Sequence, residues 1–576
     1  MRIAGLPLPS PSRASRAEAT TLLELDLTRG LVEAPPSTPL QALRERGTPS
    51  LRSVIDALRR AADDERVGGL VAHVGGAELT FAQAGELRSA VAAFRASGRT
   101  AVCWTESFGE WGPGNVTYHL ACAFEEIWLQ PSGDVGLTGV VAGAVFLRGA
   151  LDKLDVEPQI GQRHEYKTAA DTFLRTEMSD AHREMAERLA ASATEFLVAD
   201  VAADRGLTPE QVRAVIDEAP VTGERAVELG LVDRLGYRHD VYAALRERLG
   251  GGTGAGSGSG DVELKYVERY GKGVGAAIKA TATRGRPVIA VVQGSGTIHL
   301  GRSNASPLAR SESIGADTFG AALRAAGRDD DVKAVVVRVD SGGGSYVASD
   351  AIRREVLALR EAGTPVIASM GSVAASGGYF IAMAADEVLA DAGTLTGSIG
   401  VLAGKQVLAE ALGRIGVNVQ SVSTGRYAEM FSSQRRFTDE EWARLGEWLD
   451  RVYDDFTAKA AADRGMGVED LRAVARGRVW TGADAQRHGL VDILGGLDDA
   501  VGRACARAGL DRRDVEVRPF PRSNALARMM PAENSDHPAA MTASLAGAAG
   551  SWHALLEVLG LPPVGVLSMP VRWQLR

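Results

Sequence analysis

Short apolar runs alternate with amphipathic stretches along the second half of the chain, and this alternation predicts its strands and helices. Valine and isoleucine dominate five runs that are typical of buried strands, at 287–294, 332–340, 365–370, 387–391 and 417–423. Apolar residues three and four positions apart predict amphipathic helices at 318–329, 348–363 and 438–465. Strand–helix alternation of this kind predicts an α/β fold with parallel strands and crossover helices.

The same pattern occurs twice, because the chain contains an internal repeat. The stretch "AADRGLTPEQVRAVI" at 202–216 matches "AADRGMGVEDLRAVA" at 461–475, with an offset of 259 residues. Further upstream, "YHLACAFEEIWL" at 118–129 matches "YFIAMAADEVLA" at 379–390, with an offset of 261 residues. A repeat of this length indicates a duplicated domain.

The repeat and the local composition divide the chain into five expected segments. These are an N-terminal extension (1–20), a first domain (21–249), a Gly/Ser linker (250–262), a second domain (263–520) and a C-terminal tail (521–576). The tail ends in the apolar segment 552–571, which we expect to dock on the protein as a helix plus a strand; contact with a membrane surface is the alternative. Pro562 and Pro563 interrupt this segment too early for it to span a membrane.

The amino-acid composition limits which binding partners and which cellular locations we expect for this protein. The 576 residues are 45% hydrophobic and 24% charged, as in globular proteins, and the net charge of -9 disfavours a nucleic-acid partner. Three cysteines without metal-ligand spacing predict reduced thiols, and we expect neither a metal nor a cofactor. Neither a signal peptide nor a membrane-spanning run is recognised, which predicts a cytoplasmic or peripherally membrane-associated protein.

Candidate chemistry centres on Ser376, in "SVAASGGYFIA" at 372–382, directly after an apolar run. Small residues on both sides let a helix start close to the sheet, where the N–H of Gly377 favours developing negative charge. A packing surface of small residues explains the same stretch equally well. A serine hydroxyl also needs a base, and no histidine lies between His299 and His488.

Two further glycine-rich turns are candidates for the same site. The stretch "VDSGGGSYVASD" at 339–350 follows a predicted strand and can present backbone N–H groups to a carbonyl. Ser398 lies in a similar turn, "GTLTGSIGV" at 393–401. Taken alone, the first is explained by a tight turn before a helix, and the second by a hydroxyl bonded to its own backbone.

The repeat supplies a candidate base, Lys167, in a chain with only eight lysines. In the 261-residue register Lys167 of "HEYKTAADTF" aligns with Ala428, and Ser376 aligns with Asn115. Each copy therefore lacks the group that the other keeps, which favours a Ser/Lys pair divided between the copies over a surface lysine in a salt bridge. To act as a base the lysine must be neutral, so its pKa must fall from about 10.4.

The motifs "VDSGGGS", "SMGSVAASGGYFIA", "TGSIGV" and "YKTAADTF" resemble the signal peptide peptidase A (protease IV) family in its double-domain form, over roughly residues 21–510. The resemblance implies tandem duplicated Clp/crotonase-like domains with parallel β-sheet layers and flanking helices. It implies a serine endopeptidase that hydrolyses apolar peptides such as remnant signal peptides. It also implies a homo-oligomer, with a tetramer favoured, and leaves peripheral membrane contact open.

The resemblance also assigns roles to residues. It makes Ser376 the nucleophile and Lys167 the general base, and it makes Ser398 the hydroxyl that orients the lysine amine. Gly344 and Gly377 would supply the backbone N–H groups of an oxyanion hole.

Three more glycines complete the comparison with the family. Gly343 and Gly378 would support the substrate and the loop. The family usually shows Ser-Pro-Gly-Gly at the oxyanion strand, where Gly342 stands here in place of the proline. Members also commonly carry an N-terminal membrane helix, which is not recognised in this sequence.

Two other functional classes stay open at this point. A crotonase-type acyl-CoA enzyme also polarises a carbonyl with backbone N–H groups, and a non-catalytic membrane-associated scaffold would retain the fold without the chemistry. The gap in histidines disfavours a Clp-type histidine base. Whether Lys167 meets Ser376 within one chain or between chains is likewise open.

Overall fold

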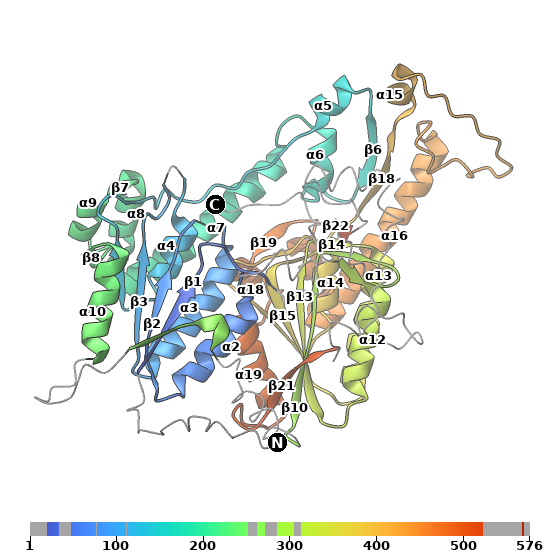
Figure 1. Cartoon of the computed structure of the whole chain (residues 1–576). Helices are drawn as coiled ribbons and strands as arrows, with labels where there is room; N and C mark the ends of the chain where they lie inside the picture. Colours follow the sequence, from blue (N-terminus) through green and yellow to red (C-terminus); the bar gives the residue numbers. More distant parts are fainter. Residues whose placement is uncertain are drawn as a thin grey trace, which may run out of the picture.

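The structure is a computed structural model that describes residues 20–33, 48–76, 78–110, 112–250, 262–270, 285–303, 313–521 and 567–568. Within these ranges two α/β units lie side by side, each built on its own mainly parallel sheet (Figure 1). The α/β class predicted from the alternation of strands and helices is therefore confirmed.

The first unit is built on a sheet of parallel strands in the order β8–β4–β3–β2–β1–β9. Their bounds are β1 (Thr21–Asp26), β2 (Val67–His73), β3 (Thr100–Thr105), β4 (Glu126–Leu129), β8 (Arg234–Leu235) and β9 (Glu263–Tyr266). One face packs against α2 (Leu51–Ala62), α3 (Phe81–Ala96), α4 (Asn115–Ala121) and α7 (Asp180–Arg205), and the other against α10 (Arg238–Gly250). Beside this sheet lie α8 (Pro209–Glu218), α9 (Gly223–Glu228) and the strand pair β5 (Asp134–Val135) and β7 (Val221–Thr222).

The second unit repeats this plan on a larger sheet, with the strand order β19–β17–β15–β13–β10–β21 and with β16 and β20 branching from β15. Its strands are β10 (Val288–Ser295), β13 (Val332–Ser341), β15 (Val366–Ala375), β16 (Glu387–Ala390), β17 (Leu395–Gly397), β19 (Val479–Thr481), β20 (Ile493–Leu494) and β21 (Glu516–Phe520). Its helices are α12 (Ala316–Gly327), α13 (Tyr346–Glu361), α14 (Gly377–Ala382), α16 (Asp439–Arg464), α17 (Val468–Val474), α18 (Gly482–Arg487) and α19 (Leu497–Arg507).

Alternate residues of the central strands pack against opposite layers. In β13, Val335 and Val337 lie in the core beneath α12, α13 and α16, whereas Ala334 and Val336 pack against α19. Because successive side chains of a strand point to opposite faces, a strand covered on both faces needs apolar residues at every position. This explains the continuous valine run in the sequence.

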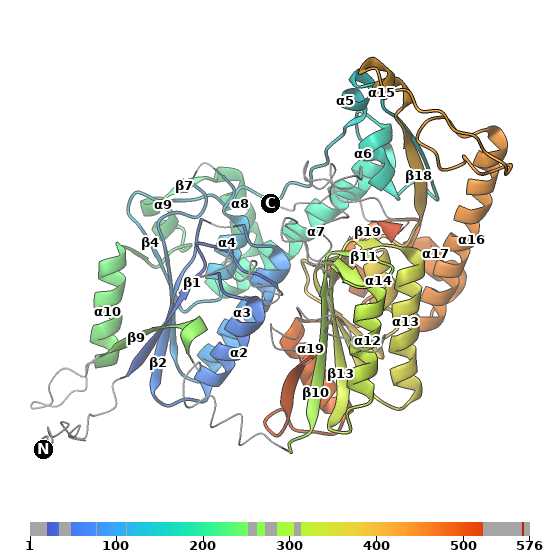
Figure 2. The same cartoon turned by 45° about the vertical axis from the view of Figure 1, so that its right-hand side comes forward.

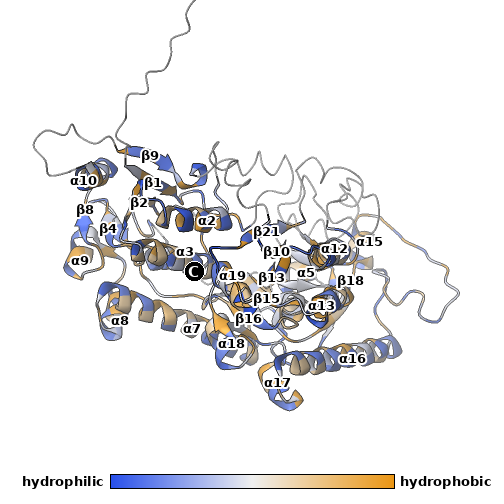
Figure 3. Cartoon of the chain, turned by 90° about the horizontal axis from the view of Figure 1, so that it is seen from below, coloured by the Kyte–Doolittle hydropathy of each residue, from blue (hydrophilic) through white to orange (hydrophobic). Residues whose placement is uncertain are grey.

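The predicted helices at 318–329, 348–363 and 438–465 correspond to α12, α13 and α16 and are confirmed. In α16 the Thr438 side chain accepts the N–H of Glu441 while the Glu441 side chain accepts the N–H of Thr438, so the helix starts with a capping box. It ends at Gly465, whose φ of +63° suits glycine. Figure 3 shows both hydrophilic and hydrophobic colours along α16, as expected of a helix with one buried face.

The repeat is visible in matching contacts of the two units. Arg205 at the end of α7 pairs with Asp233, and Arg464 at the end of α16 pairs with Asp492. The two arginines are 259 residues apart, and so are the two aspartates. The offset found in the sequence therefore relates equivalent positions in space.

The second domain was expected to start at residue 263, and here the structure differs. Residues Glu263–Tyr266 (β9) pair in parallel with β1, so they extend the first sheet. The first residues of the second sheet belong to β10, which starts at Val288. The chain therefore leaves the first unit later than the Gly/Ser linker suggests, because the backbone of β9 pairs with β1.

An arm projects beyond the second unit, at the top of Figure 2. It contains α5 (Arg148–Lys153), β6 (Glu157–Gln162) and α6 (Asp171–Leu174) from the first copy, and β18 (Leu402–Val407) and α15 (Ala409–Arg414) from the second. Strand β6 pairs antiparallel with β18, so the two copies share this small sheet.

The predicted strand at 417–423 is wrong, because none of these residues is in a strand. Val417, Val419 and Val422 are 43%, 53% and 100% exposed, so the apolar alternation faces solvent. The Val417 N–H donates to the Leu412 carbonyl of the preceding turn, and no strand pairing is assigned to the segment. Strand propensity alone does not form a sheet. The strand of this region is β18, which has β6 as its partner.

A smaller sheet lies next to the second unit, with the order β12–β11–β14–β22. Its strands are β12 (Ser313–Gly315), β11 (Thr297–His299), β14 (Gly343–Gly344) and β22 (Leu567–Ser568). Strand β22 pairs antiparallel with β14, so a piece of the apolar C-terminal segment occupies the edge of this sheet. The sequence predicts a docked helix plus strand for that segment.

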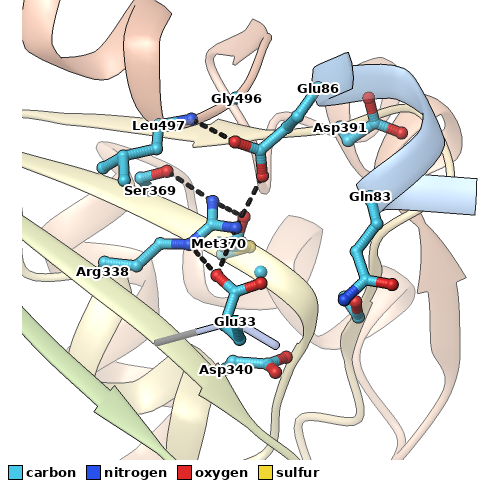
Figure 4. Close-up of polar contacts among 12 residues, drawn as sticks. Glu33, Gln83, Glu86, Arg338, Asp340, Ser369, Met370, Asp391, Gly496 and Leu497 are labelled. Carbon is cyan, nitrogen blue, oxygen red and sulfur yellow. Dashed lines mark hydrogen bonds and ion pairs between the residues drawn. The ribbon is translucent and has the colours of Figure 1, made fainter. Parts of the chain in front are cut away.

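The two units meet around a buried arginine of β13, Arg338 (Figure 4). Its guanidinium donates to Glu33 Oε1 at 2.7 Å, to Glu86 Oε1 of α3 at 2.5 Å and to Ser369 Oγ at 2.9 Å. Glu86 also accepts the N–H of Leu497 at the start of α19. These bonds fix α3 of the first unit to the sheet of the second. Among the described residues, no helix combines the length and the hydropathy needed to cross a bilayer.

Candidate active site

Ser376 follows the last residue of β15 directly and precedes α14, so the end of a central strand sets its position. Its φ of +56° and ψ of -112° lie in a region that residues other than glycine rarely adopt. The Ser376 N–H donates to the carbonyl of Gly397 at 2.8 Å, which holds this turn. The side chain is fully buried and makes no capping bond to α14, so the hydroxyl is available to another partner.

That partner is Lys167, which the arm carries from the first copy into the second unit. Its Nζ lies 2.9 Å from Ser376 Oγ, although the two residues are 209 positions apart in the chain. The same nitrogen lies 3.0 Å from Ser398 Oγ and donates to the Ser398 carbonyl at 2.9 Å. The structure thus brings these three predicted site residues together within one chain.

The surroundings of Lys167 favour its neutral form. The side chain is fully buried, and burial holds the pKa of its amine well below the usual value, because a charged amine loses its hydration there. The carboxylates of Glu165 and Glu184 nearby are bonded to Arg476 and Arg478 instead. Within the part of the chain that the structure describes, the amine contacts Ser376 and Ser398 and no carboxylate. The direction of the pKa change is the one that a general base requires.

Ser398 is held in a strained turn of its own. Its φ is +51°, and its N–H donates to the Arg478 carbonyl at 2.7 Å. This orientation points both its hydroxyl and its carbonyl at Lys167, which leaves the amine in one position relative to Ser376. The sequence alone favours a hydroxyl bonded to its own backbone, and the structure shows the bond to the lysine instead.

The four predicted glycines form one closely packed strip beside Ser376. A Cβ on Gly377 would lie 2.7 Å from Ser349 Oγ and 3.2 Å from the nitrogen of Gly344, and a Cβ on Gly378 would lie 2.5 Å from the Ser341 carbonyl. Gly343 donates its N–H to Ser341 Oγ at 3.1 Å, so that donor is already used. The backbone of β14 therefore lies directly against the residue that follows Ser376.

The equivalent place in the first copy has different chemistry. Asn115 stands where Ser376 stands in the second copy, and its side-chain amide bonds both the N–H and the carbonyl of Gly139. Ala428, which corresponds to Lys167, lies in an exposed part of the second copy's arm. The first copy thus holds an amide that is closed on its own backbone, with no amine beside it.

Sequence reasoning missed two glycines that make room for the lysine. A Cβ on Gly477, which has a φ of +84°, would lie 2.5 Å from the backbone nitrogen of Lys167, and one on Gly400 would lie 3.1 Å from Lys167 Cδ. In the 259-residue register Gly477 corresponds to Glu218. A glycine in one copy and a glutamate at the equivalent position of the other indicate a close backbone approach in the second copy only. A residue-by-residue comparison of the two copies could therefore have singled out Gly477.

Comparisons with known proteins find similarity to peptidases over most of the chain. The family model described as Peptidase family S49 matches residues 113–250 and 358–511 of the chain. "Serine protease SPPA, chloroplastic" of Arabidopsis thaliana is 34% identical over 465 residues, which are 80% of this chain and 66% of that protein. "Protease 4" of Salmonella typhi is 33% identical over 472 residues, 80% of this chain and 72% of that protein. "Protease 4" of Haemophilus influenzae is 30% identical over 483 residues, 81% of this chain and 74% of that protein.

The matched segments fall in both copies of the repeat, and the second contains Ser376 and Ser398. The first contains Lys167. The resemblance inferred from the motifs is therefore confirmed at the level of the family. The chain belongs to peptidase family S49.

Proposed function

We propose that this protein is a serine endopeptidase in which Ser376 and Lys167 form a catalytic dyad, and that it hydrolyses apolar peptides such as remnant signal peptides. The observation that carries the proposal is the 2.9 Å contact between Nζ of the buried Lys167 and Oγ of Ser376. The similarity to proteases over most of the chain supports peptides as the substrate class.

The proposed reaction is an acyl transfer that starts with a proton transfer. The neutral Lys167 amine accepts the proton of the Ser376 hydroxyl, whose oxygen attacks the carbonyl carbon of the scissile peptide bond. Ser398 holds the amine in line through its two contacts. The lysine then gives the proton to the leaving amine, and the same base deprotonates the water that hydrolyses the acyl-enzyme.

Backbone N–H groups of Gly344 and Gly377 are the proposed oxyanion donors. Support comes from the close packing of these two residues next to Ser376 and from the φ of +156° at Gly344, which a side chain would prevent. Loss of one such donor costs about 3 kcal/mol of transition-state stabilisation. Gly343 and Gly378 support this loop, since Gly343 bonds Ser341 and Gly378 has no room for a Cβ.

Substrates are proposed to bind as an extended strand along β14. Strand β22 supports this mode, because it pairs antiparallel with Gly343–Gly344 at the edge that a peptide would use. Pairing of this kind relies on main-chain hydrogen bonds, which suits an enzyme that accepts varied apolar sequences. The C-terminal stretch that includes β22, "VGVLSMPV", is itself an uncharged and largely apolar peptide.

The proposal includes a homo-oligomer, with a tetramer favoured by the resemblance, in the cytoplasm or at the membrane periphery. Exposed apolar side chains on the arm support self-association or contact with a membrane surface. Leu154, Ile415 and Phe431 are 60%, 74% and 71% exposed, and exposed apolar patches of this kind usually mark interaction surfaces.

The two alternative functions receive less support. The reaction of a crotonase-type acyl-CoA enzyme would not require the buried contact between Lys167 and Ser376. A non-catalytic scaffold would not need a lysine whose charged form is disfavoured by burial. The similarity to named proteases also favours neither of them.

Two substitutions test the proposal directly. Ser376→Ala and Lys167→Met are expected to lower kcat/KM for an apolar peptide ester by at least about 10³-fold, because the nucleophile or its base is missing. A serine-directed acylating inhibitor is expected to label Ser376 in the natural chain, as read by peptide mass spectrometry.

Matched controls separate chemistry from folding. Asn115→Ser changes the position that corresponds to Ser376 in the first copy, and Lys333→Met changes an exposed lysine of the second copy. Both are expected to keep nearly full activity. Hydrolysis that survives in Ser376→Ala, or inhibitor attached to another residue, would contradict the proposal.

A further inference from the structure

Arg478 lies at the junction between the turn of Ser398 and the turn of Lys167. Its carbonyl accepts the Ser398 N–H at 2.7 Å. The residue before it, Gly477, donates its N–H to the Ile399 carbonyl at 2.8 Å and packs against the Lys167 backbone. One short stretch of the second copy therefore contacts both the turn that carries the lysine and the turn that orients its amine.

The Arg478 side chain is 15% exposed and reaches the residue that precedes Lys167. Its guanidinium carbon lies 4.8 Å from the ring centre of Tyr166 and 4.4 Å from that of Trp480, so the cation faces two aromatic rings. Its Nη1 donates to Oε1 of Glu184 in α7 at 2.8 Å, and the Tyr166 hydroxyl donates to Oε2 of the same carboxylate at 2.7 Å. Arg478, Glu184 and Tyr166 thus form a closed network of contacts next to Lys167.

This network packs against the strand that carries Ser376. Tyr166 contacts a buried apolar cluster that includes Ala375 and Val479. Ala375 is the last residue of β15 and directly precedes Ser376. A shift of the Tyr166 ring would therefore change the distance between the Lys167 amine and Ser376 Oγ, which is 2.9 Å.

The repeat shows that the pair of Arg478 and Glu184 accompanies the contact between the amine and the hydroxyl. In the 259-residue register Arg478 corresponds to Ala219, and Glu184 corresponds to Ala443. Glu184 lies in the copy that keeps the lysine, and Arg478 lies in the copy that keeps the serine. An ion pair that served only the stability of the repeated fold would be equally useful at both places.

We propose that Arg478 and Glu184 are positioning residues for the general base. They hold the turn of Lys167 closed over its amine, acting through the Tyr166 ring and the adjoining backbone. In the described part of the chain, neither side chain is hydrogen-bonded to the Lys167 amine or to the Ser376 hydroxyl. The role rests on the proposed function, in which that amine accepts the Ser376 proton. A looser turn moves the amine away from the hydroxyl, and a misplacement of about 1 Å lowers the rate about 10²-fold.

A looser turn also admits water to the Lys167 amine. The amine is fully buried, and burial lowers its pKa. Hydration stabilises the charged form, so the pKa rises toward its usual value of about 10.4 when the turn opens. An unpaired Glu184 carboxylate would act in the same direction, because a negative charge favours the protonated amine. The charged or titratable side chains around the turn are His164, Glu165, Tyr166, Glu184, Tyr453, Arg476 and Arg478.

Arg478→Met tests the proposal by steady-state kinetics with an apolar peptide ester. We expect kcat to fall about 10- to 100-fold with KM changed less than about twofold, because the substrate is proposed to lie along β14 and not along this turn. The midpoint of the pH profile of kcat/KM is expected to move upward. Arg478→Lys keeps the charge but loses the planar guanidinium, and it is expected to recover part of kcat. A natural kcat and a natural midpoint in Arg478→Met overturn the proposal.

Glu184→Ala, alone and combined with Arg478→Met, tests the coupling of the two side chains. If they act as one unit, the double variant loses little more activity than Arg478→Met alone. The double variant also lacks the carboxylate, so its midpoint stays raised only when the turn has opened. Losses that multiply, or a midpoint that returns to the natural value in the double variant, overturn the role assigned to the pair.

A matched control breaks a buried ion pair elsewhere in the second unit. Arg353 of α13 bonds Asp463 of α16 at 2.6 Å, with side chains that are 11% and 7% exposed. Arg353→Met is expected to lower the stability of the fold but to keep the natural kcat and midpoint. A midpoint that rises equally in Arg353→Met and Arg478→Met overturns the proposal, because lost stability then moves it.

Acetylation of Lys167 gives a readout that does not depend on hydrolysis. Its rate of reaction with acetic anhydride, followed against pH by peptide mass spectrometry, measures the pKa of the amine. We expect a higher pKa in Arg478→Met than in the natural chain, and an equal pKa in both overturns the proposal. Absence of peptide hydrolysis in the natural chain would overturn the proposed function alone, since the amine still titrates.

Discussion

Burial lowers the pKa of the Lys167 amine, as the proposed role of a base requires, and it is also costly for folding. In the unfolded chain the amine binds a proton up to a pKa of about 10.4, whereas burial lowers its pKa in the folded protein. Between the lowered pKa and about 10.4, the unfolded state therefore binds more protons than the folded state. Stability must rise with pH through that window, by about 1.4 kcal/mol for each pKa unit of difference.

Lys167→Met removes this linkage, so we expect the variant to be more stable than the natural chain at pH 7 while losing activity. Guanidinium unfolding at pH 7 and at pH 10 measures the difference, which is expected to shrink at the higher pH. In the natural chain kcat/KM is expected to rise with pH as Lys167 loses its proton.

The control for this prediction is Lys333→Met, because Lys333 is an exposed lysine. Its free energy of unfolding is expected to stay within about 0.5 kcal/mol of the natural value at both pH values. A gain in stability from Lys167→Met that is the same at pH 7 and pH 10 would show that packing, and not the proton, causes it.

At the residue scale, the sequence indicated the candidate site residues but not the glycines that make room for the Lys167 side chain and backbone. The motifs and the 261-residue register singled out Ser376, Lys167 and Ser398 as candidates, and these three residues lie together in the structure. The contact between Gly477 and the backbone of Lys167 joins residues from opposite halves of the chain, so no local pattern announces it. The turn around Ser398 alone favoured a hydroxyl bonded to its own backbone, whereas the family resemblance assigned that hydroxyl to the lysine amine, from which it lies 3.0 Å away.

At the scale of single elements, the sequence pattern alone predicts some helices, whereas a strand forms only where a second strand pairs with it. The helix α16 has its apolar face, its capping box and its terminal glycine within its own sequence, so its bounds were predictable almost to the residue. The segment 417–423 has a strand pattern and no strand beside it, whereas β18 forms because β6 reaches it from the other copy. Strand pairing between distant segments depends on the whole fold.

Strand β22 occupies the edge of β14 where the substrate is proposed to bind, so we expect it to weaken substrate affinity. Leu567→Pro with Ser568→Pro removes the backbone N–H groups at these positions and is expected to release the edge of β14. Because a tethered segment acts as a competitor at high effective concentration, KM for a peptide ester is expected to fall severalfold with kcat unchanged. Steady-state kinetics measure both constants.

The tail offers a matched control, since Ser544→Pro with Leu545→Pro makes the same changes elsewhere in it. This variant is expected to keep the natural KM. A synthetic peptide of residues 562–573 is expected to raise the KM of the Leu567→Pro/Ser568→Pro variant without changing kcat. A KM that is equal in the natural chain and in that variant would show that β22 does not compete with substrate.

At the scale of the whole molecule, the contact between α3 of the first unit and the sheet of the second is built around one buried cation, Arg338. Arg338 forms ion pairs with the carboxylates of Glu33 and Glu86 in the interior, and Asp340 lies in the same cluster (Figure 4). Burial, aided by the Glu33 carboxylate, raises the pKa of Asp340 to about 7, and burial also raises the pKa of Glu86. The cluster thus holds more acidic groups than cations, and its stability depends on that arginine.

Arg338→Met is expected to cost about 3–5 kcal/mol of unfolding free energy, because it leaves buried carboxylates without a cation. Urea unfolding measures the cost, which is expected to be larger at pH 8 than at pH 5. At the lower pH the raised pKa values keep more of these carboxyl groups neutral, so less charge is left unpaired.

An exposed ion pair provides the comparison. Arg354 bonds Glu361 with both side chains more than 60% exposed, so Arg354→Met is expected to lower the unfolding free energy far less than Arg338→Met does. Adding Glu33→Gln and Glu86→Gln to Arg338→Met is expected to recover part of the loss. Equal costs for Arg338→Met and Arg354→Met would contradict the role assigned to the buried cluster.

The separation of 209 residues between Lys167 and Ser376 also sets an order of events during synthesis. The lysine is synthesised 209 residues before Ser376. When Ser376 is added to the growing chain, Gly477, which packs against the lysine backbone, lies 101 residues further along the sequence. If Ser376 and Lys167 are the proposed dyad, a growing chain cannot cut its neighbours before the second half has folded onto the first.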